Sequence, residues 1–349
     1  LDQVKSTSVV WENKLITNEL SLKRWRVFKK NKMAVISSIT LLFLIIATFI
    51  SPLIANNRPI VLKHHGELFF PVLKDYAAED FKITDRLDID YRELEMGKDD
   101  FAIWPLVQWD PFESNSKVET YPSEPTKSNL MGTDDRGRDV FTRLLYGFKY
   151  SIGYAVAVWF ISLCIGTILG GVMGYFGGKV DFISQRFVEI LSSVPQFFLL
   201  IILISIFSPS LWMLVLITCA FAWIGISYYV RAEFFKNRNR EFVEAARALG
   251  ASDLEIIFKH ILPNSLTPII TFAPFTIAGE IVGLASLDYL GFGLQVPTPS
   301  WGELLAQAQK NYTIAWWLAL YPSLALFTVL TLLNFIGQGV RDAMDPNSI

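Results

Sequence analysis

Long apolar stretches constrain this chain more than any other feature of its sequence. A helix needs about 20 apolar residues to cross the ~30 Å hydrocarbon core of a bilayer. Only 18% of the 349 residues are charged, against roughly 25% in a typical soluble domain. Charged residues are rare or absent in five stretches of sufficient length: 33–55, 150–178, 190–230, 267–290 and 315–340.

The third stretch predicts two helices rather than one. It contains 41 uncharged residues from Ile190 to Val230, and Ser208-Pro209-Ser210 near its middle has the composition of a turn. The chain is therefore predicted to be an all-α membrane protein with about six spans. Pro195 and Pro274 lie inside the predicted third and fifth spans, where a proline kinks a helix.

The distribution of charge predicts how these spans are oriented. Residues 1–32 have a formal net charge of +5, whereas residues 56–135 have a net charge of −8. Because Lys and Arg favour the cytoplasmic side, the N-terminal residues, the C-terminal residues 341–349 and the loops 179–189 and 231–262 are predicted to be cytoplasmic. The basic cluster before the first span is interpreted as a topology signal, and attraction to anionic membrane lipid is the alternative.

Residues 56–149 predict an extracytoplasmic insertion, since they are too numerous for a simple connection. Their aromatic and acidic residues indicate a small, partly ordered subdomain. Val140, Leu144 and Leu145 form an apolar stripe, which predicts an interfacial helix leading into the second span. The pair His64-His65 has no neighbouring cysteine, and adjacent residues do not share a helix face, so no metal site is predicted.

The cytoplasmic loop 231–262 predicts two short helices joined by a sharp corner. Residues 241–249 are strong helix formers, and Gly250 is placed to end that helix. Ser252-Asp-Leu-Glu255 has the pattern of a capping box, which predicts a second helix that ends before Pro263. The apolar residues of this corner need burial, either against the chain's own bundle or in a groove on a cytoplasmic partner. They are Val243, Leu249, Leu254, Ile257 and Phe258.

The chain lacks the motifs of an enzyme. The segment Gly171–Lys179 is rich in glycine, but it has Met173 at the first glycine position of a phosphate-binding loop and Val180 where Ser or Thr is needed. We therefore predict no catalytic residue, no metal and no nucleic-acid partner. Glu280 is the main charge within a span, and it is predicted either to face a transport pathway or to make an interhelical hydrogen bond.

The corner resembles a known family at the level of individual residues. Glu244-Ala245-Ala246, Gly250 and Leu262-Pro263 have the spacing of the EAA loop found in membrane subunits of bacterial ABC importers. His260 stands where that pattern usually has Ile, and this change resembles the dipeptide and oligopeptide branch.

Two further segments resemble the same branch. Residues 132–147 are similar to its GTDxxGRDxxSRLxxG segment, with Thr142 at the Ser position. Residues 288–302 are similar to its LSFLGLG and PPTPSWG segments, although Asp288 replaces Ser and Leu284 stands where Glu is frequent. The long insertion is similar to that of permeases for microcin C and longer peptides. The residues of the external motif are Gly132, Thr133, Asp134, Gly137, Arg138 and Asp139.

The resemblance implies a type I ABC importer in a bacterial inner membrane, with a first helix at 33–55 and a five-helix core at 150–340. It implies half of a peptide pathway, completed by a second permease subunit. Two ATP-binding subunits or domains would hold ATP and Mg, so this chain needs no cofactor, and an extracytoplasmic binding protein would deliver the peptide. The implied ATPase-coupling positions are Glu241, Glu244, Ala245, Ala246, Gly250, Ala251, Leu262 and Pro263.

Two other classes of protein remain as alternatives. One is a secondary transporter or channel that works without an ATPase partner, and it would need its own site for a coupling ion. The other is a membrane-anchored scaffold whose external insertion is the working part. Neither alternative requires the EAA-like corner.

Overall fold

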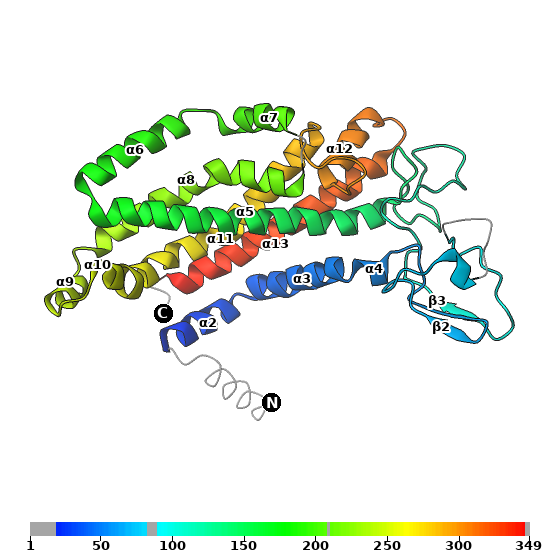
Figure 1. The fold of residues 1–349 in the computed structure, drawn as a ribbon, viewed down its shortest axis with the longest axis horizontal. Helices are drawn as coiled ribbons and strands as arrows, with labels where there is room; N and C mark the ends of the chain where they lie inside the picture. The colour runs from blue at the N-terminus through cyan, green and yellow to red at the C-terminus, as the bar shows by residue number, and fades with distance from the viewer. Residues whose placement is uncertain (1–18, 82–88, 208–209, 346–349) are drawn as a thin grey trace, which may run out of the picture. The chain divides into compact units, whose positions relative to one another are not determined.

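The computed structural model describes residues 19–81, 89–207 and 210–345 (Figure 1), and its helices and strands divide between two compact units. The first unit contains residues 1–41, 154–282 and 328–349, and the second contains residues 42–153 and 283–327. The helices are α2 (Glu19–Lys30), α3 (Lys32–Phe49), α4 (Ser51–Ile54), α5 (Val140–Phe176), α6 (Gly178–Ser192), α7 (Gln196–Ile206), α8 (Leu211–Asn237), α9 (Glu241–Ala248), α10 (Asp253–Glu255), α11 (Leu262–Tyr289), α12 (Trp301–Lys310) and α13 (Trp316–Met344). Three short strands, β1 (Val61–His64), β2 (Glu67–Phe69) and β3 (Phe101–Ile103), a 3₁₀ turn η1 (Ala78–Phe81) and a π-helical segment η2 (Ile256–Ile261) complete the described elements.

Five of the described helices are long and apolar enough to cross a membrane, and a broken pair raises the number to six. The five are α3, α5, α8, α13 and the continuous run from Asp253 to Tyr289 that includes α11. The pair is α6 and α7, which meet at an angle of 71° just before Gln196. This result agrees with the predicted number of spans. The break at Pro195 is confirmed, because α6 and α7 are separate helices on either side of it. Pro274 lies within α11, and its kink stays a prediction. Of the predicted turn, Ser208 and Pro209 lie outside the described residues.

Three predicted boundaries differ from the structure. The separate interfacial helix was wrong, because α5 runs without a break from Val140 through the second span. The predicted loop 179–189 is helical and belongs to α6. The second helix of the corner does not end before Pro263. Instead, the Leu262 N–H bonds to Ile257 O, and this wider π turn leaves room for the proline ring, so the helix continues into α11.

Within the first unit, α5 and α8 lie side by side (Figure 1), and glycines on α5 allow a very close approach. A Cβ atom at these glycines would lie only 2.5–2.8 Å from a carbonyl oxygen of α8. The pairs are Gly166 with Trp223, Gly170 with Ser227, and Gly174 with Arg231. Such a small-xxx-small stripe is typical of helices that pack tightly in membranes, so the glycine-rich segment has a structural role here.

Within the second unit, the external insertion folds around a three-stranded antiparallel sheet of order β2-β1-β3. The described side chains Leu62, Phe69, Phe81 and Tyr91 form a small buried core beneath it. Aromatic rings therefore supply the burial that so short a sheet needs.

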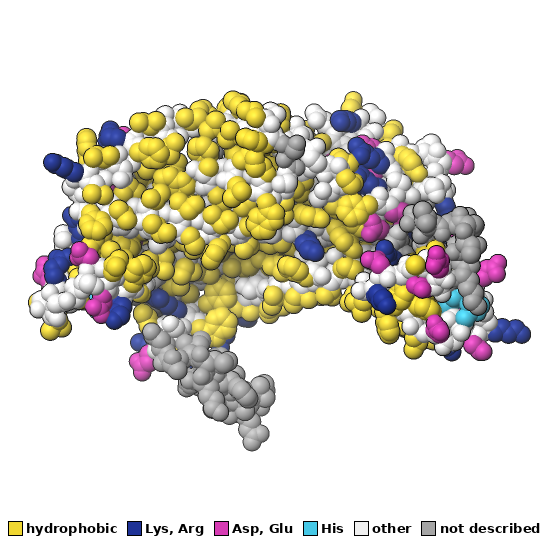
Figure 2. Space-filling model, viewed as in Figure 1, with side chains coloured by type: hydrophobic (Ala, Val, Ile, Leu, Met, Phe, Trp, Pro, Cys, Tyr) yellow, Lys and Arg dark blue, Asp and Glu magenta, His cyan; other side chains and the backbone are white. Residues whose placement is uncertain are grey.

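Apolar side chains cover the helical surface in Figure 2, whereas acidic side chains gather over the external insertion. On α6 and α7 the exposed apolar side chains include Phe182, Ile183, Phe198 and Ile202, each 57–67% exposed. A surface of this kind is stable against lipid or another protein rather than against water.

Candidate functional site

The EAA-like corner is a complete helix-ending motif. Helix α9 stops at Ala248, and Gly250 adopts the left-handed conformation with φ of +86°. The Gly250 N–H bonds to Arg247 O at 3.0 Å, and the Ala251 N–H bonds to Ala246 O at 3.1 Å. These two bonds define a Schellman motif, so the family positions Gly250 and Ala251 have a direct structural reason.

The next helix begins at the predicted cap. The Ser252 side chain accepts a hydrogen bond from the Glu255 N–H at 3.3 Å. Glu255 itself pairs with Lys259 at 2.6 Å, four residues further along the helix. The corner is thus a rigid turn between two capped helices rather than a flexible loop.

The corner's apolar residues divide between burial against the bundle and exposure. Val243 and Ala246 are buried, and Ile257 packs against the same cluster, whose other buried members come from α5, α8, η2 and α11. Leu249, Leu254 and Phe258 instead remain 89%, 67% and 62% exposed. One face of the corner therefore holds it to the bundle, and the opposite face presents three large apolar side chains.

Polar contacts connect the corner to three helices of the first unit. Tyr175 near the end of α5 donates a hydrogen bond to the Asp253 carboxylate. Asn237 at the end of α8 donates to the Ser265 hydroxyl of α11 at 3.2 Å. Arg238 donates to the carbonyl of Tyr175 at 3.3 Å. These contacts therefore link the corner to α5 as well as to the two helices that it joins. The sequence alone did not reveal Tyr175 or Asp253, because their contact joins residues 78 positions apart.

The remaining predicted coupling residues lie on this same corner. Glu241, Glu244 and Ala245 are exposed on α9, as is Pro263 at the start of α11. Leu262 is partly buried and packs against the cluster beneath the corner. The structure therefore brings the predicted coupling residues together in one short part of the chain.

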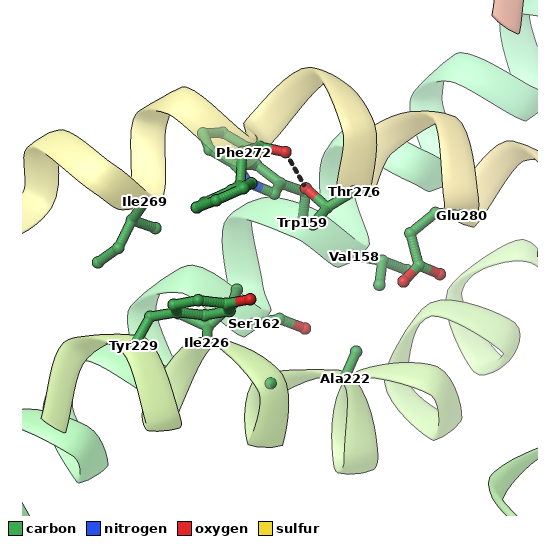
Figure 3. A pocket seen from close by; sticks show the side chains of 11 residues that line it. Val158, Trp159, Ser162, Ala222, Ile226, Tyr229, Ile269, Phe272, Thr276 and Glu280 are labelled. Carbon is green, nitrogen blue, oxygen red and sulfur yellow. Dashed lines mark hydrogen bonds between the residues drawn. The ribbon is translucent and has the colours of Figure 1, made fainter. Parts of the chain in front are cut away.

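Glu280 lies in a different place, at a cavity between α5, α8 and α11 (Figure 3). The cavity has a volume of about 140 Å³ and is lined mainly by apolar and aromatic side chains. Among the described residues, Glu280 makes no hydrogen bond or ion pair, so the predicted interhelical hydrogen bond is not formed within this chain. The lining residues are Val158, Trp159, Ser162, Ala222, Gly225, Ile226, Tyr229, Ile269, Phe272, Thr276 and Glu280.

The external motif forms a buried polar clasp within the second unit. Gly132 and Gly137 both have positive φ, at +76° and +78°, and shape its turns. The Asp134 carboxylate accepts hydrogen bonds from the Arg138 N–H at 2.9 Å and from Arg138 Nε at 2.7 Å. Asp139 caps α5 by accepting from the Thr142 N–H at 2.8 Å. These residues are used by the fold itself.

The second unit also completes this clasp from α12, which sequence reasoning missed. Glu303 pairs with Arg138 at 3.0 Å and with the buried Arg143. The Ser300 hydroxyl caps α12 by accepting from the Glu303 N–H at 3.2 Å. The Ser300-Trp-Gly-Glu303 pattern is a capping box, and it was the signal that could have predicted this helix.

Burial and charge act in opposite directions on the clasp. Burial lowers the pKa of Arg138, but the charge and hydrogen bond of Asp134 outweigh it, so this pKa lies above its usual value. Burial raises the pKa of Asp139, and hydrogen bonds from Asn129 and Thr142 oppose that rise in part. The clasp is stable only as a complete set of partners.

Comparison with known proteins assigns the class that these features define, a multi-spanning membrane component of a transport system. Residues 166–348 match the model of the binding-protein-dependent transport system inner membrane component. Residues 23–65 match the N-terminal transmembrane domain of oligopeptide transport permease C. The chain therefore belongs to the family of binding-protein-dependent transport system inner membrane components.

Three relatives support this assignment. The inner membrane ABC transporter permease protein YejE of Escherichia coli K12 is 39% identical, and the match covers 93% of this chain and 96% of the relative. The peptidoglycan transport system permease protein YejE of Agrobacterium fabrum is 37% identical, with coverage of 93% and 92%. The oligopeptide transport system permease protein OppC of Haemophilus influenzae is 38% identical, with coverage of 69% and 75%. The resemblance to ABC importer permeases of the dipeptide and oligopeptide branch is thereby confirmed.

Proposed function

We propose that this chain forms half of the pathway of an ATP-driven peptide importer. The relatives named above include permeases for oligopeptides and for peptidoglycan, whose common feature is a peptide portion, and this supports a cargo that contains peptide. The other half would come from a second permease subunit, and an extracytoplasmic binding protein would deliver the cargo. ATP and Mg would be bound by two cytoplasmic ATPase subunits or domains.

The observation that carries the coupling proposal is the exposed apolar face of the corner. Leu249, Leu254 and Phe258 stand on a rigid turn whose other face is packed against the bundle. Full burial of side chains of this size contributes about 1.5–3 kcal/mol each. A short helix that inserts such side chains into a groove is a common recognition mode, and the ATPase is the partner that this mechanism requires.

The proposal also fixes an orientation. The corner must face the cytoplasm, where ATP is available, so both termini are cytoplasmic and the sheet-containing insertion lies outside. That insertion has a compact aromatic core, which supports a role as a docking lobe for the binding protein. The excess of acidic residues between 56 and 135 agrees with this orientation.

The connections of the corner determine which helices would move with it. It is continuous with α8 and with α11, and Tyr175 ties it to α5. A shift imposed by ATP binding would tilt these helices together and alternate the side on which the pathway opens, with ATP favouring the outward-open form. The coupling is reciprocal, so delivery of loaded binding protein should favour the ATP-engaged state.

Replacement of Gly250 by Val tests the coupling. Nothing lies within 4 Å of a Cβ atom built at Gly250, so the substitution acts through its φ of +86° alone. A residue other than glycine pays about 1–2 kcal/mol or more in this conformation, and a β-branched residue tolerates it least. We expect the subunit to insert normally but to lose most of its ATP-dependent peptide uptake in proteoliposomes.

Gly66 provides a matched control, because it has the same φ of +86° and the same open surroundings, but lies in the turn between β1 and β2. Because Gly66 lies in the proposed docking lobe, Gly66→Val should leave co-purification of the subunit with its ATPase unchanged, whatever its effect on peptide delivery. If Gly250→Val transports peptide normally and still purifies with its ATPase, the corner is not the coupling element.

A further inference from the structure

A carboxylate stands at the cavity between α5, α8 and α11 without a protein partner. Glu280 is partly buried inside the membrane-spanning run Asp253–Tyr289, and no basic residue lines the cavity. An acidic side chain at that depth is costly unless it faces protein, water or a charged ligand. The cavity also holds the buried hydroxyl of Ser162, which lies beside the Cys219 thiol and has no nitrogen or oxygen partner within the described part of the chain.

The cavity has room for a substituent of moderate size. Its volume of about 140 Å³ is similar to the roughly 150 Å³ of an engineered protein cavity that binds benzene. The side chains of α11 face those of α8 across this space in Figure 3. An ammonium group on an alkyl chain or a planar guanidinium group fits within it.

Aromatic rings line the same cavity as the carboxylate, toward its other end (Figure 3). Trp159, Tyr229 and Phe272 come from three different helices, and the rings of Tyr229 and Phe272 stack with centroids 5.3 Å apart. Aromatic faces attract organic cations, and this attraction is strongest where water is excluded. Hard inorganic cations instead prefer several oxygen ligands, which this mostly apolar lining does not supply.

We propose that this cavity binds a positively charged amino or guanidino group of the transported peptide, with Glu280 as its counter-ion. The aromatic rings line the part of the cavity that would hold the carbon chain carrying the cation, and Ser162 supplies a hydroxyl oxygen as acceptor. This inference rests on the proposed function as a peptide importer and adds a preference for cargo charge.

Substitution of Glu280 by Gln in the complete importer tests the proposal. Three peptides of one sequence are compared in proteoliposomes: the parent with a lysine, the same peptide with that lysine acetylated, and the same peptide with its N-terminus acetylated. For each acetylated peptide, the uptake rate of the parent peptide is divided by that of the acetylated form. Because a hydrogen bond to a charged group stabilises binding, we expect E280Q to lower at least one of these two ratios by about tenfold. E280D should retain the direction of the preference.

Two further variants sharpen the result. Gly225→Leu fills the cavity from α8 without a backbone clash, since nothing lies within 4 Å of its Cβ position, and it should weaken uptake of the same charged peptide. Glu189→Gln removes an exposed acid that pairs with Arg186 on α6, and it should leave the preference unchanged.

The outcomes separate this inference from the proposed function. If E280Q transports all three peptides with unaltered ratios, or slows all three equally, the cation site is disproved while peptide import stands. If the wild-type complex imports none of the peptides with ATP, the proposed function itself fails.

Discussion

At the scale of single residues, Arg143 shows how much of the second unit depends on one side chain. It is completely buried and donates to the carbonyls of Pro111 at 3.0 Å and Pro297 at 3.2 Å, and it also pairs with Glu303. A guanidinium group can satisfy several acceptors at once because its donors are fixed in a plane. No other side chain offers that geometry.

Replacement of Arg143 by Met should destabilise the subunit severely. It removes one of the two arginine partners of Glu303 and leaves the carbonyls of Pro111 and Pro297 without this donor, and breaking a buried ion pair costs about 3–5 kcal/mol. Thermal unfolding of the detergent-solubilised importer should show the loss. Arg136→Met is the matched control, since Arg136 lies in the same motif but its side chain is 55% exposed, and its effect should be small. Equal melting temperatures for the two variants would show that the clasp does not stabilise the unit.

The sequence identified the residues of the two family motifs, but it did not predict which contacts they make in the fold. Gly250 and Gly132 were recognisable because a family pattern places glycine at turns, and the structure gives both a positive φ. The partner of Arg143 could not be predicted, because Glu303 lies 160 residues away and nothing local in the sequence connects them. Local patterns reveal caps and turns, whereas long-range ion pairs appear only once the chain is folded.

At the scale of helices, the glycine stripe that lets α5 and α8 approach closely is testable. Gly170→Ala would place a Cβ atom 2.5 Å from Ser227 O, so the helices must separate. Overpacking of this kind costs about 1–3 kcal/mol. We expect a lower melting temperature of the solubilised subunit.

The same helix contains its own control. Gly153 also lies on α5, but nothing lies within 4 Å of its Cβ position. Gly153→Ala should therefore be neutral or slightly stabilising, because alanine favours a helix over glycine by about 1 kcal/mol. A Gly170→Ala subunit as stable as Gly153→Ala would contradict tight packing between α5 and α8.

Helices were predicted correctly where an apolar stretch was long enough to span a membrane. They were missed where charged residues interrupted the apolar stretch. Residues 179–189 were taken for a loop because they contain four charged residues. In the structure one of these, Asp181, pairs with Arg231 of α8, so the segment can remain helical beside the bundle. The prediction that a helix ends before Pro263 was wrong for a similar reason. A proline usually ends a helix, but the π turn before Pro263 lets this helix continue.

At the scale of the whole molecule, transport requires that the corner and the spanning helices move together. The described structure offers a specific route through the hydrogen bond from Tyr175 to Asp253. Tyr175→Phe removes only the hydroxyl group and keeps the buried ring. We expect fewer peptides transported per ATP hydrolysed, by about two- to tenfold, because hydrogen bonds to charged groups contribute about 1.5–3 kcal/mol before exposure is considered.

This ratio is measured by following peptide uptake and phosphate release in the same proteoliposomes. Tyr312→Phe is the control, since Tyr312 is 78% exposed between α12 and α13. An unchanged ratio in Tyr175→Phe would mean that the corner acts only through α8 and α11.

The π-helical segment η2 has one more consequence. A π turn contains one residue more than an α turn, so η2 is equivalent to a single residue inserted into a helix that is otherwise regular. Each residue of an α-helix advances the chain by about 100° around the axis. That one residue therefore sets the angle between the exposed Phe258 side of the corner and the cavity-facing side of α11. A one-residue deletion in η2 would turn the corner by roughly a quarter of a revolution relative to α11, and it would pull Ile256 and Ile261 out of the cluster beneath the corner.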